Sequence, residues 1–245
     1  MNPMASVKEH YDNLLASCYS WMCGGFELKL KKNRAFFQEH SIRPAHSANA
    51  VDLGTGSGFQ AIPLAEAGFN VTAIDVSRDL LAELNKTAGK LPIRTIQDDL
   101  LNFAEHSPAK IEIFTCMGDT LTHLKTPAEV EELIHSVYRA LEKEGILILD
   151  FRDMMVELTQ LDRFIPVRSD SKRIFTCFLE YEKCHVKVHD IFYEKIDDQW
   201  KMKKSFFRKL RISSQWAKEC LLKAGFKVEK YDIENGMITM IARKQ

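Results

Sequence analysis

The chain lacks several features that would assign it to a special class of protein. No apolar run approaches the roughly 18 residues that a membrane-spanning helix needs, and the polar start, Met1–His10, does not resemble a signal peptide. Net charge is absent too, because 34 Lys and Arg residues balance 34 Asp and Glu residues. Nothing therefore favours a polyanionic partner. We expect a cytoplasmic protein that engages neither a membrane nor a nucleic acid.

Metal-binding cysteine patterns are also missing. The six cysteines form no C-x-x-C pair, and we expect reduced, mostly buried thiols. A zinc site from Cys177, Cys184, His185 and His189 is conceivable, but their spacing matches no known finger, so we predict no bound metal. Repeats and low-complexity segments are absent. A chain of 245 residues suits one α/β domain with an insertion, or two small domains.

What the sequence does contain is a buried strand that breaks into a glycine-rich turn. The segment Val51–Gly58 reads V-D-L-G-T-G-S-G, and a helical pattern follows from Phe59. Glycines let a ligand approach the main chain without a Cβ in the way, and the helix start offers free N–H groups. The next apolar strand, Asn70–Asp75, ends in an acid. An acid at this point of a βαβ unit is placed to bind two ribose hydroxyls.

The glycine spacing separates two kinds of nucleotide-binding turn. Nicotinamide-binding turns read G-x-G-x-x-G, whereas this turn reads G-x-G-x-G with Asp52 two residues before the first glycine. The pattern resembles motif I of the class I S-adenosylmethionine-dependent methyltransferases. That resemblance implies that the turn holds the methionine part of S-adenosylmethionine and that the later acid holds the ribose. The cofactor residues expected from this region are Asp52, Gly54, Thr55, Gly56, Gly58, Asp75 and Val76.

A second acidic site follows the third strand, which we predict over residues 92–97. Asp98, Asp99 and Leu100 come directly after this strand. In the resembled family an acid here accepts a hydrogen bond from the adenine amino group, and the next backbone N–H meets the ring. A carboxylate suits this task because an amino group only donates. Aligning Phe103 with the family's usual apolar residue favours Asp99 over Asp98.

The fourth strand, Lys110–Met117, leads into the loop where we expect the chemistry. Ligands of doubly wound sheets bind beyond the carboxyl ends of the strands. Met117 is accordingly predicted at the cofactor, and Asp119 and His123 at the acceptor. The loop C-M-G-D-T-L-T-H-L resembles the G-N-S-F-x-H-L of the glycine and sarcosine N-methyltransferases.

In this loop Asp119 stands where that group has asparagine. A carboxylate only accepts hydrogen bonds and carries a charge. Asp119 therefore suits a cationic or amine substrate, or a base, and argues against glycine as the acceptor. His123 is the other candidate base, and a structural histidine is an equally good interpretation of it.

The fifth strand, Ile146–Leu149, ends in Asp150-Phe-Arg-Asp153. This resembles the family form D-H-R-N, in which the arginine pairs with the carboxylate of the substrate. Arg152 occupies that position, and a guanidinium offers a planar fork that matches a carboxylate. A surface ion pair with a neighbouring aspartate is the alternative.

Residues 1–49 precede the core and show helical periodicity over 6–22 and 26–42, separated by Gly24-Gly25. In the resembled family such leading helices cover the cofactor. The segment H-Y-D at 10–12, followed by Y-x-W at 19–21, resembles the N-terminal cap of small-molecule members of the family. This resemblance implies that Tyr11 lies on the cofactor and that Tyr19 or Trp21 faces the substrate. An amphipathic packing helix is the competing interpretation.

After an irregular stretch at 154–172, three runs have strand character: 173–181, 185–195 and 201–212. We predict an antiparallel meander that forms a lid near the active-site end. The last run is rich in Lys and Arg with two phenylalanines between them, which is typical of RNA binding. Exposed lysines on an edge strand also protect against aggregation, and the zero net charge favours this second explanation.

The final segment completes the predicted fold. Ser213 or Ser214 caps a helix that ends at Gly225, and Asn235-Gly236 joins two closing strands, the last of them antiparallel. The sequence thus predicts an α/β fold with a doubly wound, seven-stranded, mostly parallel sheet. Its parts are an N-terminal helical cap at 1–49, a core at 50–153 and 213–245, and an inserted β-meander lid at 154–212.

The predicted function is methyl transfer from S-adenosylmethionine to a small-molecule acceptor, an amine or a carboxylate-bearing metabolite, by a monomer or homodimer. Two alternatives remain. One is a non-catalytic or RNA-directed protein that binds S-adenosylmethionine. The other is a nicotinamide-dependent oxidoreductase, which the glycine spacing disfavours.

Overall fold

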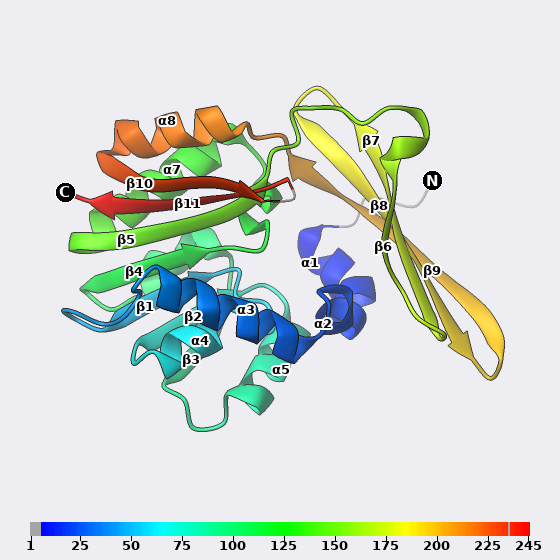
Figure 1. Cartoon of the computed structure of the whole chain (residues 1–245), viewed down its shortest axis with the longest axis horizontal. Helices are drawn as coiled ribbons and strands as arrows, with labels where there is room; N and C mark the ends of the chain where they lie inside the picture. The colour runs from blue at the N-terminus through cyan, green and yellow to red at the C-terminus, as the bar shows by residue number, and fades with distance from the viewer. Residues whose placement is uncertain (1–5, 235) are drawn as a thin grey trace.

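Two β-sheets with a helical cap between them make up the molecule (Figure 1). The computed structural model describes residues 6–234 and 236–245. The strands of the larger sheet, in spatial order, are β10 (Phe226–Glu234), β11 (Met237–Lys244), β5 (Leu141–Arg152), β4 (Ile111–Cys116), β1 (Asn49–Leu53), β2 (Asn70–Asp75) and β3 (Ile93–Gln97). The smaller sheet consists of β6 (Phe164–Ser169), β7 (Arg173–Tyr181), β8 (His185–Ile196) and β9 (Gln199–Leu210).

The larger sheet confirms the predicted seven-stranded, mostly parallel topology. Strands β1 to β5 run parallel, and β11 is antiparallel to both β5 and β10. Because β1 lies between β2 and β4, the strand order reverses at this point. In doubly wound sheets the crevice at such a reversal receives the ligand. The carboxyl ends of β1, β2 and β4 therefore mark the edge where a site is expected.

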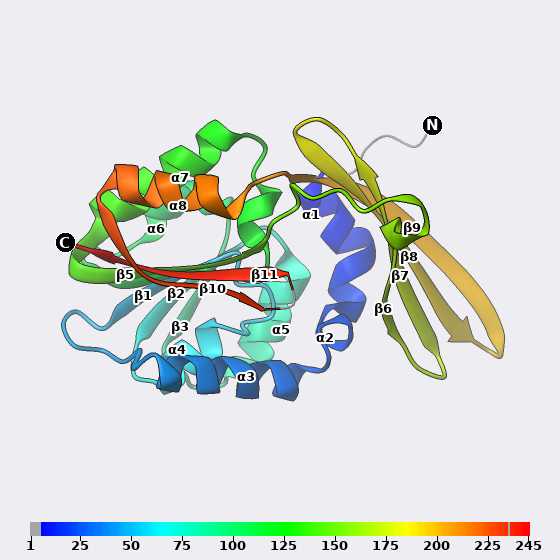
Figure 2. The same cartoon turned by 45° about the horizontal axis from the view of Figure 1, so that its top comes forward.

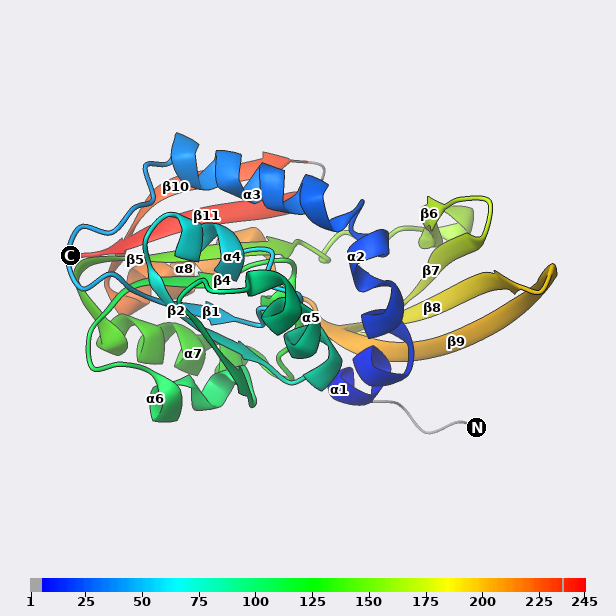
Figure 3. The ribbon, with the colours of Figure 1, turned by 90° about the horizontal axis from the view of Figure 1, so that it is seen from below.

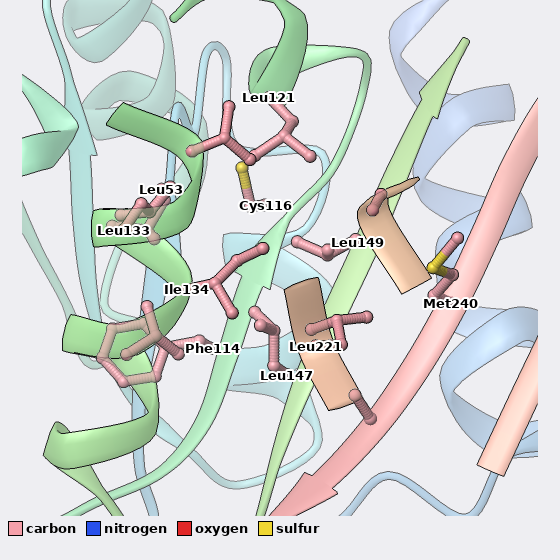
Figure 4. Packing of buried hydrophobic residues seen from close by; sticks show 14 of the residues in the cluster. Leu53, Phe114, Cys116, Leu121, Leu133, Ile134, Leu147, Leu149, Leu221 and Met240 are labelled. Carbon is pink, nitrogen blue, oxygen red and sulfur yellow. The ribbon is translucent and has the colours of Figure 1, made fainter. Parts of the chain in front are cut away.

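Helices cover both faces of the core sheet (Figure 2). On one face lie α7 (Pro127–Ala140), α8 (Ser214–Ala224) and the short α6 (Phe103–His106). The other face carries α3 (Phe26–Glu39), α4 (Ala61–Glu66) and α5 (Arg78–Ala88). Figure 4 shows how Leu133 and Ile134 of α7 pack with Phe114 and Leu147 of the sheet. This packing fixes the strand ends from which the site is built.

Hydroxyl side chains cap three helices, and the cap expected at Ser213 or Ser214 is Ser213. The hydroxyl of Thr126 accepts the N–H of Glu129 at 3.2 Å, and Pro127 occupies the first turn of α7. Ser77 and Ser213 cap α5 and α8 in the same way. Each cap satisfies a backbone donor that would otherwise lack a partner at the helix start.

The N-terminal cap is a broken helical rod that lies between the core and the second sheet, as Figures 2 and 3 show. It consists of α1 (Val7–His10), a π-helical turn η1 (Tyr11–Leu15), a 3₁₀ turn η2 (Ala16–Cys18) and α2 (Tyr19–Met22). Leu14, Leu15 and Cys18 are buried against Phe175 and Phe192 of the smaller sheet. The rod therefore attaches the smaller sheet to the rest of the chain.

Three expectations about element boundaries were wrong. The stretch expected to be irregular contains β6, which pairs along β7, with Phe164 opposite Phe178. Strand β5 begins at Leu141 rather than Ile146, and the helix expected to end at Ile42 ends at Glu39. Pairing with a neighbouring strand stabilises both strand segments, although charged residues and a proline obscure their sequence pattern.

Two further expectations concern the closing hairpin and the thiols. Strands β10 and β11 form the predicted hairpin, and the expected turn residue Asn235 lies outside the described residues. Cys18, Cys116 and Cys220 are buried, but Cys184 is exposed. No helix in the described part of the chain combines the length and the apolar character needed to cross a bilayer.

The buried ring of Phe114 provides a test of this core. Phe114→Ala should lower the free energy of unfolding by about 3–5 kcal/mol, because the ring is fully buried at 0% exposure and truncation leaves a cavity. Urea denaturation followed by circular dichroism measures the loss. Ile233→Ala is the matched control, since Ile233 is 56% exposed. Equal losses in the two variants would contradict the packing described here.

Candidate functional site

A cavity of about 680 Å³ opens at the carboxyl ends of β1, β2 and β4. Its volume lies in the range of sites that enclose small-molecule ligands. All three parts of the fold contribute walls to it. The lining residues include Tyr11 and Tyr19 from the cap, Gly54, Gly56, Asp75, Val76, Asp98, Asp99, Leu100, Leu101, Gly118, Thr120 and His123 from the core, and His185 and Arg208 from the smaller sheet.

The glycine turn after β1 presents bare backbone to this cavity. Gly54 and Gly56 have φ angles of +70° and +53°, in the left-handed region that favours glycine. A Cβ on Gly54 would lie 2.3 Å from Cγ2 of Thr120, and a Cβ on Gly56 would lie 3.3 Å from Cε1 of Tyr19. Larger residues would therefore narrow the cavity between the turn, the cap and the β4 loop.

Asp75, at the end of β2, is tied to this turn. Its Oδ2 accepts the N–H of Gly56 at 2.8 Å, and its Oδ1 accepts the N–H of Ser77 at 2.8 Å. Burial raises the pKa of the Asp75 carboxyl, while the two N–H donors oppose the rise. A carboxylate has about four lone-pair sites. Two thus remain for further donors, such as the neighbouring hydroxyls of a ribose.

The loop after β3 distinguishes the two adjacent acids. Asp98 is held by His106, whose Nε2 lies 2.6 Å from Oδ2, and its Oδ1 accepts the side-chain amide of Asn102 at 3.0 Å. In Asp99, Oδ1 accepts the N–H of Leu101 at 3.0 Å. Both acids line the cavity, but both carboxylate oxygens of Asp98 already have side-chain partners. The arrangement favours Asp99 as the acceptor for a purine amino group.

Four predicted cofactor residues lie behind the cavity wall rather than in it. They are Asp52, Thr55, Gly58 and Met117. Asp52 accepts the hydroxyls of Thr55 and Thr115 at 2.6 Å each, and burial raises its pKa to about 6. Gly58 leaves room for Leu84, whose Cδ1 lies 2.2 Å from the position of an added Cβ. Asp52, Thr55 and Gly58 thus shape the turn whose Gly54 and Gly56 line the cavity.

The cap supplies two tyrosines to the cavity. The Tyr11 hydroxyl lies 3.4 Å from Nε2 of His123, and the Tyr11 and Tyr19 rings are 5.9 Å apart. Tyr19 also stacks on Phe59 at 5.6 Å. Trp21 points elsewhere, because its indole N–H donates to Asp170 at 2.7 Å. Of the two residues expected toward the substrate, Tyr19 is the one that lines the cavity.

Asp119 is fully engaged within the protein. It has a φ of +74°, its Oδ1 accepts the N–H of Arg152 at 3.0 Å and the hydroxyl of Thr122 at 3.1 Å, and its Oδ2 forms an ion pair with Lys209 of β9. Burial raises its pKa, but Lys209 and the hydrogen bonds outweigh this effect and hold the pKa below its usual value. Asp119 does not line the cavity.

His123 lines the cavity as a neutral imidazole. Burial, followed by the positive charge of Lys209, lowers its pKa to about 3. Phe207 of β9 stacks on the ring at 5.3 Å. Within the described residues, Nδ1 of His123 is buried without a hydrogen-bond partner. The other ring nitrogen, Nε2, has the Tyr11 hydroxyl as its neighbour.

The structure does not bring Arg152 to the cavity. Its side chain is exposed at the end of β5 and is absent from the cavity wall; only its backbone N–H takes part, as the donor to Asp119. The expected pairing of this guanidinium with a substrate carboxylate therefore finds no support in this geometry.

The second sheet contributes residues that sequence reasoning overlooked. Lys209 and Phe207 reach the β4 loop from β9, and Arg208 and His185 line the cavity. The signal available in the sequence was the period of two, which places Phe207 and Lys209 on one face and Arg208 on the other. Without the strand pairing, that period does not show which face meets the core.

Two candidate zinc ligands in the smaller sheet, Cys177 and His189, instead form hydrogen bonds with acids. Cys177 donates its thiol to Asp190 at 2.8 Å, and His189 meets Glu180 at 3.0 Å. Residues 6–234 and 236–245 contain no group of three or more side chains arranged to hold a metal ion. Three basic residues of β9 form ion pairs with acids: Lys203 with Glu194, Arg208 with Glu182 and Lys209 with Asp119.

Comparison with known proteins agrees with this geometry. Residues 50–145 match the family model described as a methyltransferase domain. A glycine/sarcosine N-methyltransferase of Aphanothece halophytica is 34% identical over 111 residues, which cover 44% of this chain and 42% of that protein. The matched segment thus spans less than half of the length of this relative.

Solved structures extend the similarity to the whole fold. An S-adenosylmethionine-dependent methyltransferase from Clostridium acetobutylicum has a TM-score of 0.73 at 16% identity and covers 96% of both chains. The sugar N-methyltransferase KedS8 from Streptoalloteichus has a TM-score of 0.72 at 13% identity and covers 100% of this chain and 97% of its own. At these identities the likeness establishes the fold.

The role of Asp75 can be tested by titration calorimetry with S-adenosylmethionine. Asp75→Ala should weaken binding by about 10-fold to 150-fold, because charge-assisted hydrogen bonds contribute about 1.5–3 kcal/mol. Asp79→Ala is the matched control, since Asp79 is exposed in the first turn of α5. Thermal melting of each variant separates lost affinity from lost folding. Unchanged affinity in a folded Asp75→Ala protein would remove Asp75 from the site.

Proposed function

We propose that this chain, a member of the class I S-adenosylmethionine-dependent methyltransferases, transfers a methyl group to the nitrogen of a small-molecule amine. The glycine turn and Asp75 line one part of the cavity. Another part is lined by Tyr11, Tyr19 and His123, whose pKa is about 3. The named functions of the relatives support nitrogen as the acceptor atom.

The residues present fit the cofactor of this family. Asp75 would accept the ribose hydroxyls and Asp99 the adenine amino group, with Val76 and Leu100 beside the ring. Gly54 and Gly56 would leave room for the methionine part, and Tyr11 and Tyr19 would close the pocket from the cap. The bound cofactor supplies an electrophilic methyl group on a sulfonium, so the protein mainly has to align an acceptor lone pair.

The pocket suits an acceptor that arrives as a neutral amine. Asp119 is already neutralised by Lys209, and it lies outside the cavity wall. His123 has a pKa of about 3, well below the range in which an imidazole is an effective base at neutral pH. We therefore assign His123 Nε2 the task of accepting a hydrogen bond from the amine N–H. The proton released on methylation leaves to water.

The observation that carries this proposal is the position of the His123 imidazole in the cavity wall, with its Nε2 3.4 Å from the Tyr11 hydroxyl. An uncharged imidazole nitrogen can hold an amine N–H and thereby aim the nitrogen lone pair. A protonated imidazole could only donate, and it would repel a cation.

Incubation with methyl-labelled S-adenosylmethionine and a panel of small amines, phenols and carboxylates tests the proposal. We expect labelled product from one or more amines, detected by mass spectrometry, and none from phenols or carboxylates. Product from phenols alone would overturn the assignment of nitrogen. Cofactor binding without any product across the panel would instead favour a non-catalytic binding protein.

Replacement of His123 tests its orienting role. His123→Ala should lower kcat on the order of 100-fold while leaving the Kd for S-adenosylmethionine unchanged, because misplacement of an acceptor by about 1 Å costs this much. His135→Ala is the control, since His135 is exposed on α7. Steady-state kinetics and calorimetry give the two values. A His123→Ala enzyme with full kcat would rule out this role.

A further inference from the structure

Lys209 joins the smaller sheet to the loop that carries His123. The two partners of its ion pair, Lys209 on β9 and Asp119 after β4, lie 90 residues apart in the sequence. Their side chains are only 13% and 7% exposed. A buried charge requires a partner, since removing one member of such a pair leaves the other uncompensated. Among the described residues, no second ion pair joins β9 to the loop after β4.

Asp119 stands directly before the 3₁₀ turn η4 (Thr120–His123) that carries His123. Its Oδ1 holds the N–H of Arg152 and the hydroxyl of Thr122, which fixes the start of the turn against β5. The carboxylate thus positions the turn, but it also places a negative charge near the imidazole. Such a charge, left alone, favours a protonated histidine.

Lys209, on β9, compensates the negative charge of Asp119. On the inner face of β9, Phe207 lies two residues before Lys209, and its ring stacks on His123 at 5.3 Å. The Lys209 ammonium lies 5.8 Å from the centre of the Phe207 ring. The ring of His10, in the cap, also lies close to Phe207, with the ring centres 4.3 Å apart and the planes tilted. The groups that face His123 are therefore Tyr11, His10, Asp119 and Lys209.

We infer that Lys209 is a positioning residue for the acceptor pocket: its ion pair with Asp119 holds the turn that carries His123 against the second sheet and offsets the carboxylate charge near the imidazole. The benefit to catalysis rests on the proposed function, whereas the ion pair itself does not. It also explains how the chain tolerates a carboxylate in the β4 loop, because Lys209 neutralises it.

The sign of the effect follows from the charges around the ring. Burial and Lys209 both lower the pKa of His123, whereas Asp119 raises it. Lys209→Met would leave Asp119 uncompensated, so the pKa of His123 should rise. A neighbouring opposite charge typically shifts a pKa by roughly 1 to 3. Catalysis should then be lost as the pH falls through the new, higher value.

The test is an NMR titration of the His123 ring in four proteins: wild type, Lys209→Met, Lys209→Arg and Lys204→Met. We expect the pKa of His123 to rise by at least about one unit in Lys209→Met and to stay low in Lys209→Arg, which keeps the charge. Lys204→Met should match wild type, because Lys204 is exposed on the outer face of β9. The acidic limb of kcat/KM should move upward in Lys209→Met alone.

A second comparison keeps the inference testable if Lys209→Met does not fold. Asp119→Asn removes the carboxylate, and adding Lys209→Met to it removes the ion pair without leaving a bare buried charge. The pKa of His123 should be higher in the double variant than in Asp119→Asn alone. Equal values in this pair, or in folded Lys209→Met and wild type, would reduce Lys209 to a structural contact.

The NMR readout needs no acceptor and no turnover. A shift of the His123 titration without any detectable methyl transfer would sustain the role of Lys209 and refute the proposed activity. Methyl transfer from amines with an unmoved His123 titration would do the reverse.

Discussion

The hydrogen bond from the Gly56 N–H to Asp75 is the constraint on which the site depends. It joins the turn after β1 to the end of β2, at the point where the sheet order reverses. The bond holds bare backbone and a carboxylate on the same side of one cavity. Asp52 supports the turn from behind by accepting the hydroxyl of Thr55. The contribution of the cap and of the second sheet is to close this preformed edge.

The sequence was sufficient for the core because its signals there are local. The glycines at 54–58, the acid that ends β2 and the cap at Ser213 each act within a few residues. The element boundaries that were missed depend on partners distant in the sequence. Strand β6 forms against β7, and the start of β5 forms opposite Ile111. A pattern of single residues does not contain that pairing.

The same limit applies to the site. Tyr11, Gly54, Gly56, Asp75 and Asp99 were predictable because they belong to recognisable motifs, and all of them line the cavity. Lys209 belongs to no motif. Its partnership with Asp119 appears only when the pairing of β8 with β9 turns its side chain inward. Arg152 shows the converse: a motif position whose side chain the fold directs to the surface.

Asp119 has a different role in the structure from the one that its sequence position suggests. From the sequence it was a candidate base or a partner for a cationic substrate. In the structure it anchors the His123 turn, and Lys209 neutralises it. In the proposed acceptor pocket His123 then takes the place of a carboxylate as the hydrogen-bond acceptor, and the proposal of a neutral amine follows from this exchange.

The most direct test is a crystal structure of the protein with S-adenosylhomocysteine. We expect both ribose hydroxyls within hydrogen-bond distance of Asp75, with the adenine beside Val76 and Leu100 and its amino group toward Asp99. A ligand bound elsewhere, or an Asp75 carboxylate turned away from the nucleoside, would contradict this expectation.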